Sequence, residues 1–331
     1  SITFSSTILF MDFSTNGIVT VIPAYRVQDT ITTVLKDLPA YIKHIIVVDD
    51  ASPDSSVKLV TAAAQQDPRI ILIRHERNQG VGGAMISGFH KALELGAKIV
   101  VKLDGDGQMD SAHIPALVTP LILGKADFTK GNRFRDFVSL RNMPMVRRVG
   151  NLGLSFLTKA ATGYWNIFDP TNGFFAIRTE VLKQLPLEAI DKRYFFETSL
   201  LANLYLVNAF VMDVPMPARY GNETSHLSIR RSLLEFPLKL FSTLIRRILL
   251  KYYIYDFSII SLYIVTSIPL LLFGFIFGAI KWIDYASRNI PAPTGTVMLP
   301  TLCVILGIQI MLSAIEIDMK STPSQPICDP L

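Results

Sequence analysis

Two long stretches without a charged side chain lie near the C-terminal end of this 331-residue chain, over 257–280 and 297–315. A helix needs about 20 apolar residues to cross a bilayer, and core helices of soluble proteins rarely run so far without a charge. The sequence therefore predicts a transmembrane hairpin over 257–316, with a connecting loop over 281–296. Residues 317–331 are expected to form a tail on the side of the membrane from which the hairpin started.

Basic residues gather just before the first apolar stretch, where only Glu235 and Asp256 oppose them. They are Arg230, Arg231, Lys239, Arg246, Arg247 and Lys251. Positive residues beside a span favour the cytoplasmic side, so the N-terminal domain and the tail are expected there. Apolar residues recur among them at helical spacing, which predicts amphipathic interfacial helices over 229–256, divided at Pro237. A surface helix packed on the soluble domain is the alternative.

Composition excludes several classes of protein. The net charge of +5 is modest and is placed before the spans, so it does not indicate a nucleic-acid partner. Two cysteines, Cys303 and Cys328, make neither a disulfide framework nor a metal site. Residues 1–16 lack the pattern of a signal peptide and are expected to be a leader or an added extension. Packing of interfacial helices is compatible with a homo-oligomer.

Between residues 17 and 228, short apolar runs alternate with helical patterns. Strands are expected over 18–22, 44–48, 70–73 and 98–103, and helices over 30–38, 55–64 and 83–95. This rhythm predicts a doubly wound, Rossmann-like α/β domain with a parallel sheet. Ligands bind such sheets beyond the carboxyl ends of the strands, and polar clusters follow each expected strand here. Four strand ends are thus expected to converge on one crevice.

Asp104 and Asp106 flank Gly105 directly after the expected strand over 98–103. Carboxylates two residues apart in an extended segment point to the same side and can bind one hard cation. Gly105 and Gly107 carry no Cβ, so a bulky anion can approach the backbone. The pattern suggests a metal-bridged diphosphate; taken alone, a polar turn is the simpler interpretation.

A second glycine-rich segment runs from Gly80 to Gly83 and imitates a dinucleotide-binding turn, with Asp104 about 20 residues further on. A membrane-anchored dehydrogenase is therefore a rival interpretation. Against it, Met85 stands where the last small residue of that motif belongs, and the turn follows a later strand instead of the first.

Taken together, the motifs resemble glycosyltransferase family 2 with the GT-A fold. The similar branch transfers a sugar to a polyisoprenyl phosphate and includes bactoprenol glucosyltransferases and dolichyl-phosphate mannose synthases. The resemblance covers about 18–227 and rests on the segments VIPAY, VVDDASPD, DGDGQ, KGNRF, DPTNGFF and the RYG and SHL pair. Departures are Arg26-Val27 after the first segment, Met109-Asp110 after the metal motif and His226 in the last.

The resemblance implies roles for particular residues. Asp104, Asp106 and Gln108 would approach Mg²⁺ or Mn²⁺. The nucleotide would contact Pro23, Ala24, Tyr25, Asp50, Gly80 and Asp104. Phosphate groups would contact Arg133, Arg148 and Arg219, whose planar forks suit phosphate oxygens. Asp169 would position the sugar or the acceptor, and Glu197 would anchor the same region.

For Asp50, capping of the following helix is the structural alternative. For Asp169, a general-base role is secondary, because a phosphate monoester is already largely dianionic at neutral pH.

The implied activity is transfer of a hexose, with UDP-glucose as the expected donor, to undecaprenyl phosphate at the cytoplasmic face of a bacterial inner membrane. One displacement would invert the anomeric carbon. GDP-mannose is the alternative donor, and a non-catalytic membrane scaffold is a further class. A processive polysaccharide synthase is disfavoured, since its Gln-x-x-Arg-Trp motif is missing and two spans are few for a polymer channel.

Overall fold

The computed structural model describes residues 12–132, 145–170, 172–216 and 229–331. Side chains are not described at 145–152 and 229–234. The chain divides into two compact units. The first contains Ser1–Leu244 together with Pro323–Leu331, and the second contains Ile245–Thr322.

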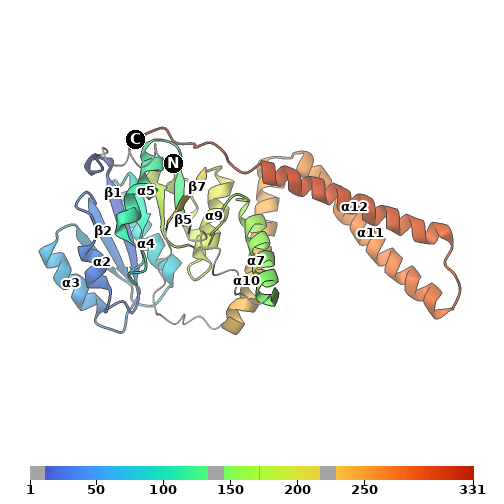
Figure 1. Cartoon of the computed structure of the whole chain (residues 1–331), viewed down its shortest axis with the longest axis horizontal. Coiled ribbons are helices and arrows are strands. Elements are labelled where there is room, and N and C mark those ends of the chain that lie inside the picture. Colours follow the sequence, from blue (N-terminus) through green and yellow to red (C-terminus); the bar gives the residue numbers. More distant parts are fainter. Residues whose placement is uncertain (1–11, 133–144, 171, 217–228) are drawn as a thin grey trace. The chain divides into compact units, whose positions relative to one another are not determined.

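A seven-stranded sheet forms the centre of the first unit within the described residues (Figure 1). Its strands are β1 (Ile18–Ala24), β2 (His44–Asp49), β3 (Ile70–Arg74), β4 (Ile99–Lys102), β5 (Phe128–Asn132), β6 (Phe175–Arg178) and β7 (Val211–Pro215). Their spatial order is β3-β2-β1-β4-β6-β5-β7. β6 runs antiparallel to both neighbours, whereas every other pairing is parallel.

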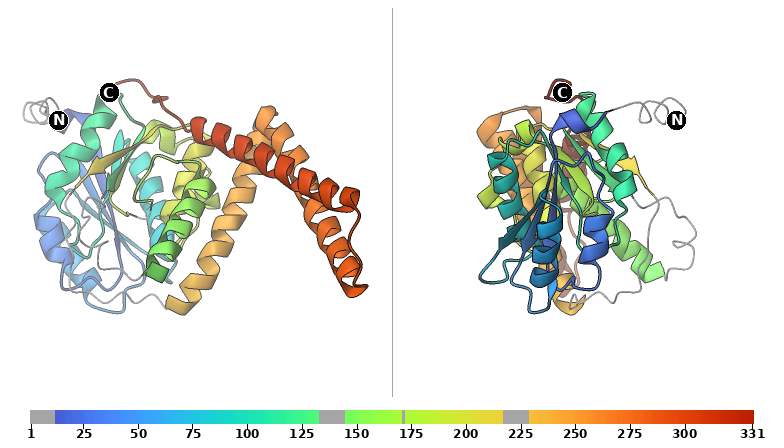
Figure 2. Two further views of the ribbon diagram at one scale, coloured as in Figure 1. Left: turned by 45° about the vertical axis from the view of Figure 1, so that its right-hand side comes forward. Right: turned by 90° about the vertical axis from the view of Figure 1, so that its left-hand side faces the viewer.

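Helices cover both faces of this sheet (Figure 2). One face carries α2 (Ile31–Lys36), α3 (Ser56–Gln66) and α5 (Ile114–Ile122). The other carries α4 (Val81–Glu94), α8 (Thr179–Leu182) and α9 (Phe196–Leu206), and α7 (Met145–Thr162) packs against α9. Short 3-10 helices are η1 (Ser14–Asn16), η2 (Ser111–His113) and η3 (Leu187–Ala189). Burial on both faces explains why the strands read as nearly continuous apolar runs.

The predicted alternation of strands and helices over residues 18–103 is confirmed, with element ends shifted by at most two residues. The first four strands are parallel, as expected. The reversal at β6 makes the sheet mixed and was not predicted, because an apolar run such as Phe175–Arg178 carries no information about strand direction.

Residues 12–16 pack on the domain instead of standing apart from it. Phe13 is buried in the cluster beneath α2 and α5, and its ring centroid lies 5.1 Å from that of Tyr41. Of the segment expected to be a leader or an added extension, residues 12–16 thus pack on the domain, and residues 1–11 lie outside the described part.

One continuous helix, α10 (Ile229–Leu249), follows the domain built on the sheet, so the prediction that Pro237 divides two helices is wrong. Phe236 and Leu240, on either side of the proline, pack in a cluster with Phe195. This packing offsets the lost hydrogen bond and the steric cost of about 3 kcal/mol that an internal proline imposes. Leu238 and Phe241 are 71% and 61% exposed, so α10 has one packed and one exposed apolar side.

The second unit contains a hairpin of α11 (Ile259–Ser287) and α12 (Thr294–Lys320), preceded by a π-helix, η4 (Leu250–Tyr255). Both long helices are long and apolar enough to cross a membrane. Their connection is shorter than the predicted loop over 281–296, because Trp282 and Tyr285 belong to the last turns of α11. These two helices form a candidate transmembrane hairpin.

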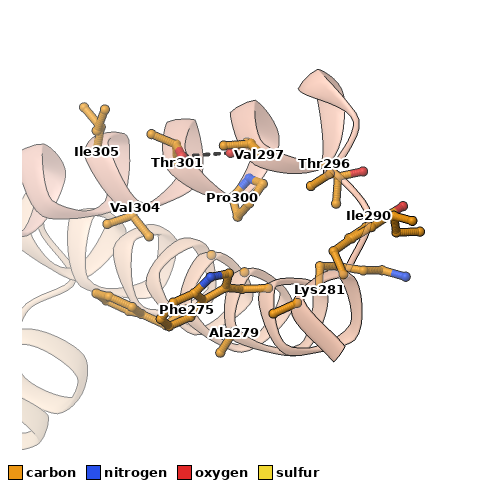
Figure 3. Close-up of a pocket in the computed structure, with 16 residues that line it drawn as sticks. Phe275, Ala279, Lys281, Ile290, Thr296, Val297, Pro300, Thr301, Val304 and Ile305 are labelled. Atoms are coloured by element: carbon orange, nitrogen blue, oxygen red, sulfur yellow. Dashed lines mark hydrogen bonds between the residues drawn. The ribbon is translucent and has the colours of Figure 1, made fainter. Parts of the chain in front are cut away.

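A cavity of about 700 Å³ lies between α11 and α12 near their connection (Figure 3). Phe275 of α11 and Pro300 and Val304 of α12 line it. Gly278 is a further lining residue. Lys281 stands at its rim. Its walls are mainly apolar, and Thr296 and Thr301 add hydroxyl groups.

The basic residues before the hairpin are opposed by more than Glu235 and Asp256. Lys239 pairs with Asp191 at 2.6 Å. Arg247 is buried and pairs with Asp318 of α12. The sequence estimate of a largely unpaired basic patch is therefore corrected for these two residues.

The tail after α12 returns to the first unit. The carboxylate of Asp127, fully buried, accepts hydrogen bonds from the backbone N–H groups of Ile327, Cys328 and Phe210. The N–H of Leu331 donates to the carbonyl of Ile122 at 2.9 Å. The tail thus extends the hydrogen bonding of the first unit beyond β5 and α5.

Candidate functional site

The carboxyl ends of β1, β2 and β4 meet at one edge of the sheet. Ala24 at the end of β1 is in register with Asp49 at the end of β2. The loops that follow are joined to each other: Asp50 N–H donates to Ala24 O at 2.9 Å, and Arg26 N–H donates to Ser52 Oγ at 3.2 Å. The residues predicted to contact a nucleotide, 23–25 and Asp50, are therefore brought together. Tyr25 is exposed, and the guanidinium carbon of Arg26 lies 5.3 Å from its ring centroid.

Asp50 is buried, and both of its carboxylate oxygens have partners within the chain. Oδ1 accepts from the N–H of Gln79 at 2.8 Å, and Oδ2 accepts from the N–H of Gly80 at 2.7 Å. His75 Nδ1 lies 2.8 Å from Oδ1. Asp50 therefore fixes the loop before α4. The alternative was that Asp50 caps α3, the helix after its own strand, but its carboxylate accepts no hydrogen bond from that helix in the described part of the chain. Direct contact with a nucleotide stays a prediction.

Its neighbour Asp49 is the carboxylate with an open acceptor. Asp49 is 3% exposed, Oδ2 accepts from Ser52 N–H at 3.3 Å, and Oδ1 has no hydrogen-bond partner in the described part of the chain. Such a buried acceptor costs free energy unless a ligand donates to it. The sequence marked the Asp49-Asp50 pair, but only the structure separates the two roles.

The glycine-rich turn before α4 packs against another segment of the chain, residues 191–193. A Cβ on Gly80 would lie 2.6 Å from Lys192 O, and Gly83 N–H donates to the same oxygen at 3.0 Å. A Cβ on Gly82 would collide with Asp191 O. The glycines thus allow residues 191–193 to pack closely on the turn. A dinucleotide phosphate would accept hydrogen bonds from the backbone N–H groups at this helix start, and the N–H of Gly83 is already occupied. This arrangement disfavours the dehydrogenase interpretation.

Asp104 and Asp106 lie in the turn directly after β4, and both are half-buried. Asp106 Oδ1 accepts from Gln108 N–H at 3.0 Å, and Gly107 adopts a φ of 75°, which favours glycine. Thr30 Oγ1 donates to Gly105 O at 2.7 Å and ties the turn to α2. A cavity of about 290 Å³, lined in part by Asp106 and Gly107, opens beside it.

The turn fits a divalent cation that completes its shell with substrate oxygens. A Cβ on Gly173 would lie 2.9 Å from Asp104 Oδ2, so the glycine leaves this oxygen clear. Asp104 Oδ1 is held by Lys102. In the described residues no three His, Cys, Asp or Glu side chains converge on one point. Mg²⁺ is usually bound by one or two carboxylates together with substrate phosphates, so a third protein ligand is not required. Asp104 and Asp106 would then hold the cation together with the diphosphate.

Two buried lysines stand behind this turn. Lys102 on β4 and Lys130 on β5 are both in register with Phe175 on β6, so they point to the same face of the sheet. Lys102 Nζ lies 2.7 Å from Asp104 and 3.3 Å from Glu197 of α9. Burial acts to lower the pKa of Lys102, but the two carboxylates outweigh it and raise the pKa above its usual value.

Lys130 holds the segment that follows Asp169, the residue expected to position the sugar or the acceptor. Its ammonium donates to the carbonyl of Asn172, and Asn172 Nδ2 donates in turn to Gly131 O at 2.7 Å. Burial lowers the pKa of Lys130 to about 8, against the attraction of Glu197 and Asp169. Asp169 is fully buried, and its expected contact with sugar or acceptor stays a prediction.

Sequence reasoning missed Lys102, Lys130 and Asp213. Asp213 accepts from Phe168 N–H at 2.9 Å, and burial raises the pKa of its carboxyl group. The signal for the two lysines was their position within buried strands, in IVVK and in FTKGN. A buried charge is normally paired, so each of these lysines indicated a carboxylate or another partner nearby.

Three predicted phosphate contacts are not tested by the geometry. Arg133 and Arg219 lie outside the described residues. Arg148 falls within α7, but its side chain is not described.

The mixed α/β sheet of the first unit has the GT-A fold. The chain belongs to glycosyl transferase family 2, whose model matches residues 19–186. This match confirms the resemblance deduced from the motifs and identifies the chain as a glycosyltransferase.

Individual relatives are similar over the catalytic domain. A UDP-N-acetylglucosamine:dolichyl-phosphate N-acetylglucosaminyltransferase of Methanococcus voltae is 36% identical over 187 residues, 53% of this chain and 74% of the relative. An undecaprenyl-phosphate mannosyltransferase of Micrococcus luteus is 28% identical, covering 60% and 82%. In fold, the chain resembles glucosyl-3-phosphoglycerate synthase of Mycobacterium tuberculosis, at a TM-score of 0.53 and 20% identity, covering 71% and 80%.

Proposed function

We propose that this protein transfers one sugar from a nucleoside diphosphate sugar to the phosphate of a polyisoprenol. The observation that carries the proposal is the half-buried pair Asp104 and Asp106, with Asp104 Oδ2 kept clear by Gly173, in a family 2 chain that ends in a candidate transmembrane hairpin. The relatives named above act on dolichyl and undecaprenyl phosphate. A membrane hairpin suits such an acceptor, because it keeps donor site and lipid phosphate at one interface.

In the proposed reaction an oxygen of the lipid phosphate bonds to the anomeric carbon as the bond from that carbon to the nucleoside diphosphate breaks. A dianionic phosphate needs orientation more than proton removal. When bound by Asp104 and Asp106, Mg²⁺ or Mn²⁺ would offset the charge that develops on the leaving diphosphate. The fold neighbour from Mycobacterium tuberculosis was crystallised with Mn²⁺ and UDP-glucose, which is consistent with this assignment.

For the sugar, we propose N-acetylglucosamine from its UDP donor, with mannose from GDP-mannose as the second candidate. The relative at 36% identity uses the first, and the relative at 28% is named for mannose. The expectation of glucose finds no support in these names. In the base site, Asp49 Oδ1 offers a buried acceptor that a base or ribose donor would satisfy.

The test is a transfer assay on the detergent-purified protein with undecaprenyl phosphate and Mg²⁺ or Mn²⁺. Labelled UDP-N-acetylglucosamine, GDP-mannose and UDP-glucose are supplied separately, and radioactivity in the organic phase is counted. Product from one donor, abolished by EDTA, supports the proposal and identifies the sugar. Binding of a nicotinamide cofactor without any glycolipid would instead support a dehydrogenase.

A further inference from the structure

Lys102 connects the cation turn to a helix on one face of the sheet. Its buried ammonium contacts Asp104 Oδ1 at 2.7 Å and Glu197 Oε1 at 3.3 Å, while its side chain is only 1% exposed. Glu197 lies in the first turn of α9. One cation therefore serves two carboxylates that come from different elements.

The charges of this group decide what remains for a ligand. With Asp104 alone, Lys102 would cancel the carboxylate that is to bind a metal. With Glu197 included, two carboxylates and one ammonium leave one negative charge, and Asp106 adds a second. Because Lys102 is screened from water, a single charge beside it changes the local potential more than it would on the surface.

The second buried lysine, Lys130, and the charged groups around it also lie close to Glu197. Lys130 is attracted by Glu197 and Asp169 and lies near Asp213, so Glu197 faces both lysines. Removing its charge would take one compensating carboxylate from Lys102, which contacts Asp104, and from Lys130 as well. That change weakens the attraction for any cation at the turn.

We propose that Glu197 is a positioning residue that shares Lys102 with Asp104 and so keeps Asp104 available to a divalent cation. This inference rests on the proposed function, since it assumes that a cation binds at Asp104 and Asp106. The competing explanation is that Glu197 only fastens α9 to β4, in which case its charge matters for stability and not for the cation.

The experiment measures Mn²⁺ binding directly, by electron paramagnetic resonance of free Mn²⁺, with UDP or GDP present and no acceptor. Glu197→Gln keeps the shape and a hydrogen-bond acceptor but removes the charge. We expect Mn²⁺ to bind about tenfold more weakly, equivalent to ~1.4 kcal/mol. Adding Lys102→Met to this variant removes the surplus cation, so the double variant is expected to bind within about threefold of the wild type.

Glu180→Gln is the matched control. Glu180 also pairs with a buried cation, Arg178, at 2.6 Å, but at the opposite end of β6, where Arg178 is in register with Ile99. It should leave Mn²⁺ binding unchanged. Melting curves of all variants verify folding.

Two failures are distinguishable. If the wild type binds Mn²⁺ and Glu197→Gln binds it equally, or if Lys102→Met fails to restore binding in the double variant, the inference is overturned. If the folded wild type binds no Mn²⁺ with either nucleotide, the proposed function itself fails.

Discussion

Arg247 and Asp318 form a bidentate ion pair inside the second unit, with nitrogen-oxygen distances of 2.8 and 2.9 Å. The hydroxyl of Tyr252 also donates to Asp318. Replacing Asp318 with Asn would leave a buried guanidinium without its counter-charge, which typically costs about 3–5 kcal/mol. We expect Asp318→Asn to lower the midpoint of thermal unfolding in detergent and to expose the hairpin to protease.

An exposed pair on the same hairpin provides the comparison. Arg288 and Asp284 lie 2.9 Å apart, but the arginine side chain is 64% exposed. Asp284→Asn should change stability by less than about 1 kcal/mol, as is usual for surface pairs. Equal effects of the two substitutions would contradict the structural role assigned to Asp318.

Gly173 tests the shape of the cation turn without changing its charge. An alanine Cβ would collide with Lys102 and come within 2.9 Å of Asp104 Oδ2. Because small displacements of reacting groups are costly, transfer activity of Gly173→Ala should fall by a factor of about 100. Gly153→Ala in α7, where a Cβ meets nothing within 4 Å, is the control and should keep its activity. Unchanged transfer by Gly173→Ala would refute the assigned fit.

The tail contact can be followed through Cys328. Burial, with Asp127 nearby, raises the pKa of this thiol to about 12, so alkylation at pH 8 should be at least ~100-fold slower than for a free cysteine. Asp127→Ala removes the acceptor for three backbone N–H groups and should release the tail. In a Cys303→Ser background, we expect rapid labelling of Cys328 by a maleimide in this variant only. Rapid labelling of Cys328 with Asp127 intact would show that the tail is not docked.

Lys130 predicts a pH dependence of stability. Its pKa is about 8 in the folded protein and about 10.5 when unfolded, so the unfolded chain binds more protons between these values. Stability should therefore rise from pH 8 to pH 10.5, by about 3 kcal/mol from this group, while the full penalty of the buried charge is present below pH 8. Chemical unfolding at several pH values should show this slope in the wild type and not in Lys130→Met. A parallel slope in both proteins would contradict the assignment.

Much of the architecture was readable from the sequence because burial on both faces leaves a strong apolar signal. The apolar signal predicts the strands β1 to β4, and the Asp104–Asp106 turn is located directly after the last of them. The hairpin is predicted from the uncharged stretches. Pro237 shows the limit of local rules, since packing of Phe236 and Leu240 overrides the proline. The reversal of β6 depends on chain connections that no local pattern records.

The site was predictable in outline but not in its electrostatics. The motifs located Asp50 and Asp104. They did not reveal that the carboxylate of Asp50 accepts hydrogen bonds from Gln79 and Gly80, whereas Asp49 Oδ1 has no partner in the described part of the chain. Nor did they reveal that Lys102 and Lys130 face one residue of β6. Such partners are distant in sequence and are set by register and tertiary packing.

The most direct test of the central claim compares the wild type with Asp104→Asn for transfer of labelled sugar to undecaprenyl phosphate. Each protein is assayed with its best donor at saturating Mn²⁺, and the extracted glycolipid is counted. The wild type should form a lipid-linked sugar that EDTA abolishes, and Asp104→Asn should lose activity by about 100-fold or more while remaining folded at the assay temperature. A folded wild type that forms no glycolipid from any donor, or an Asp104→Asn variant as active as the wild type, would contradict the account.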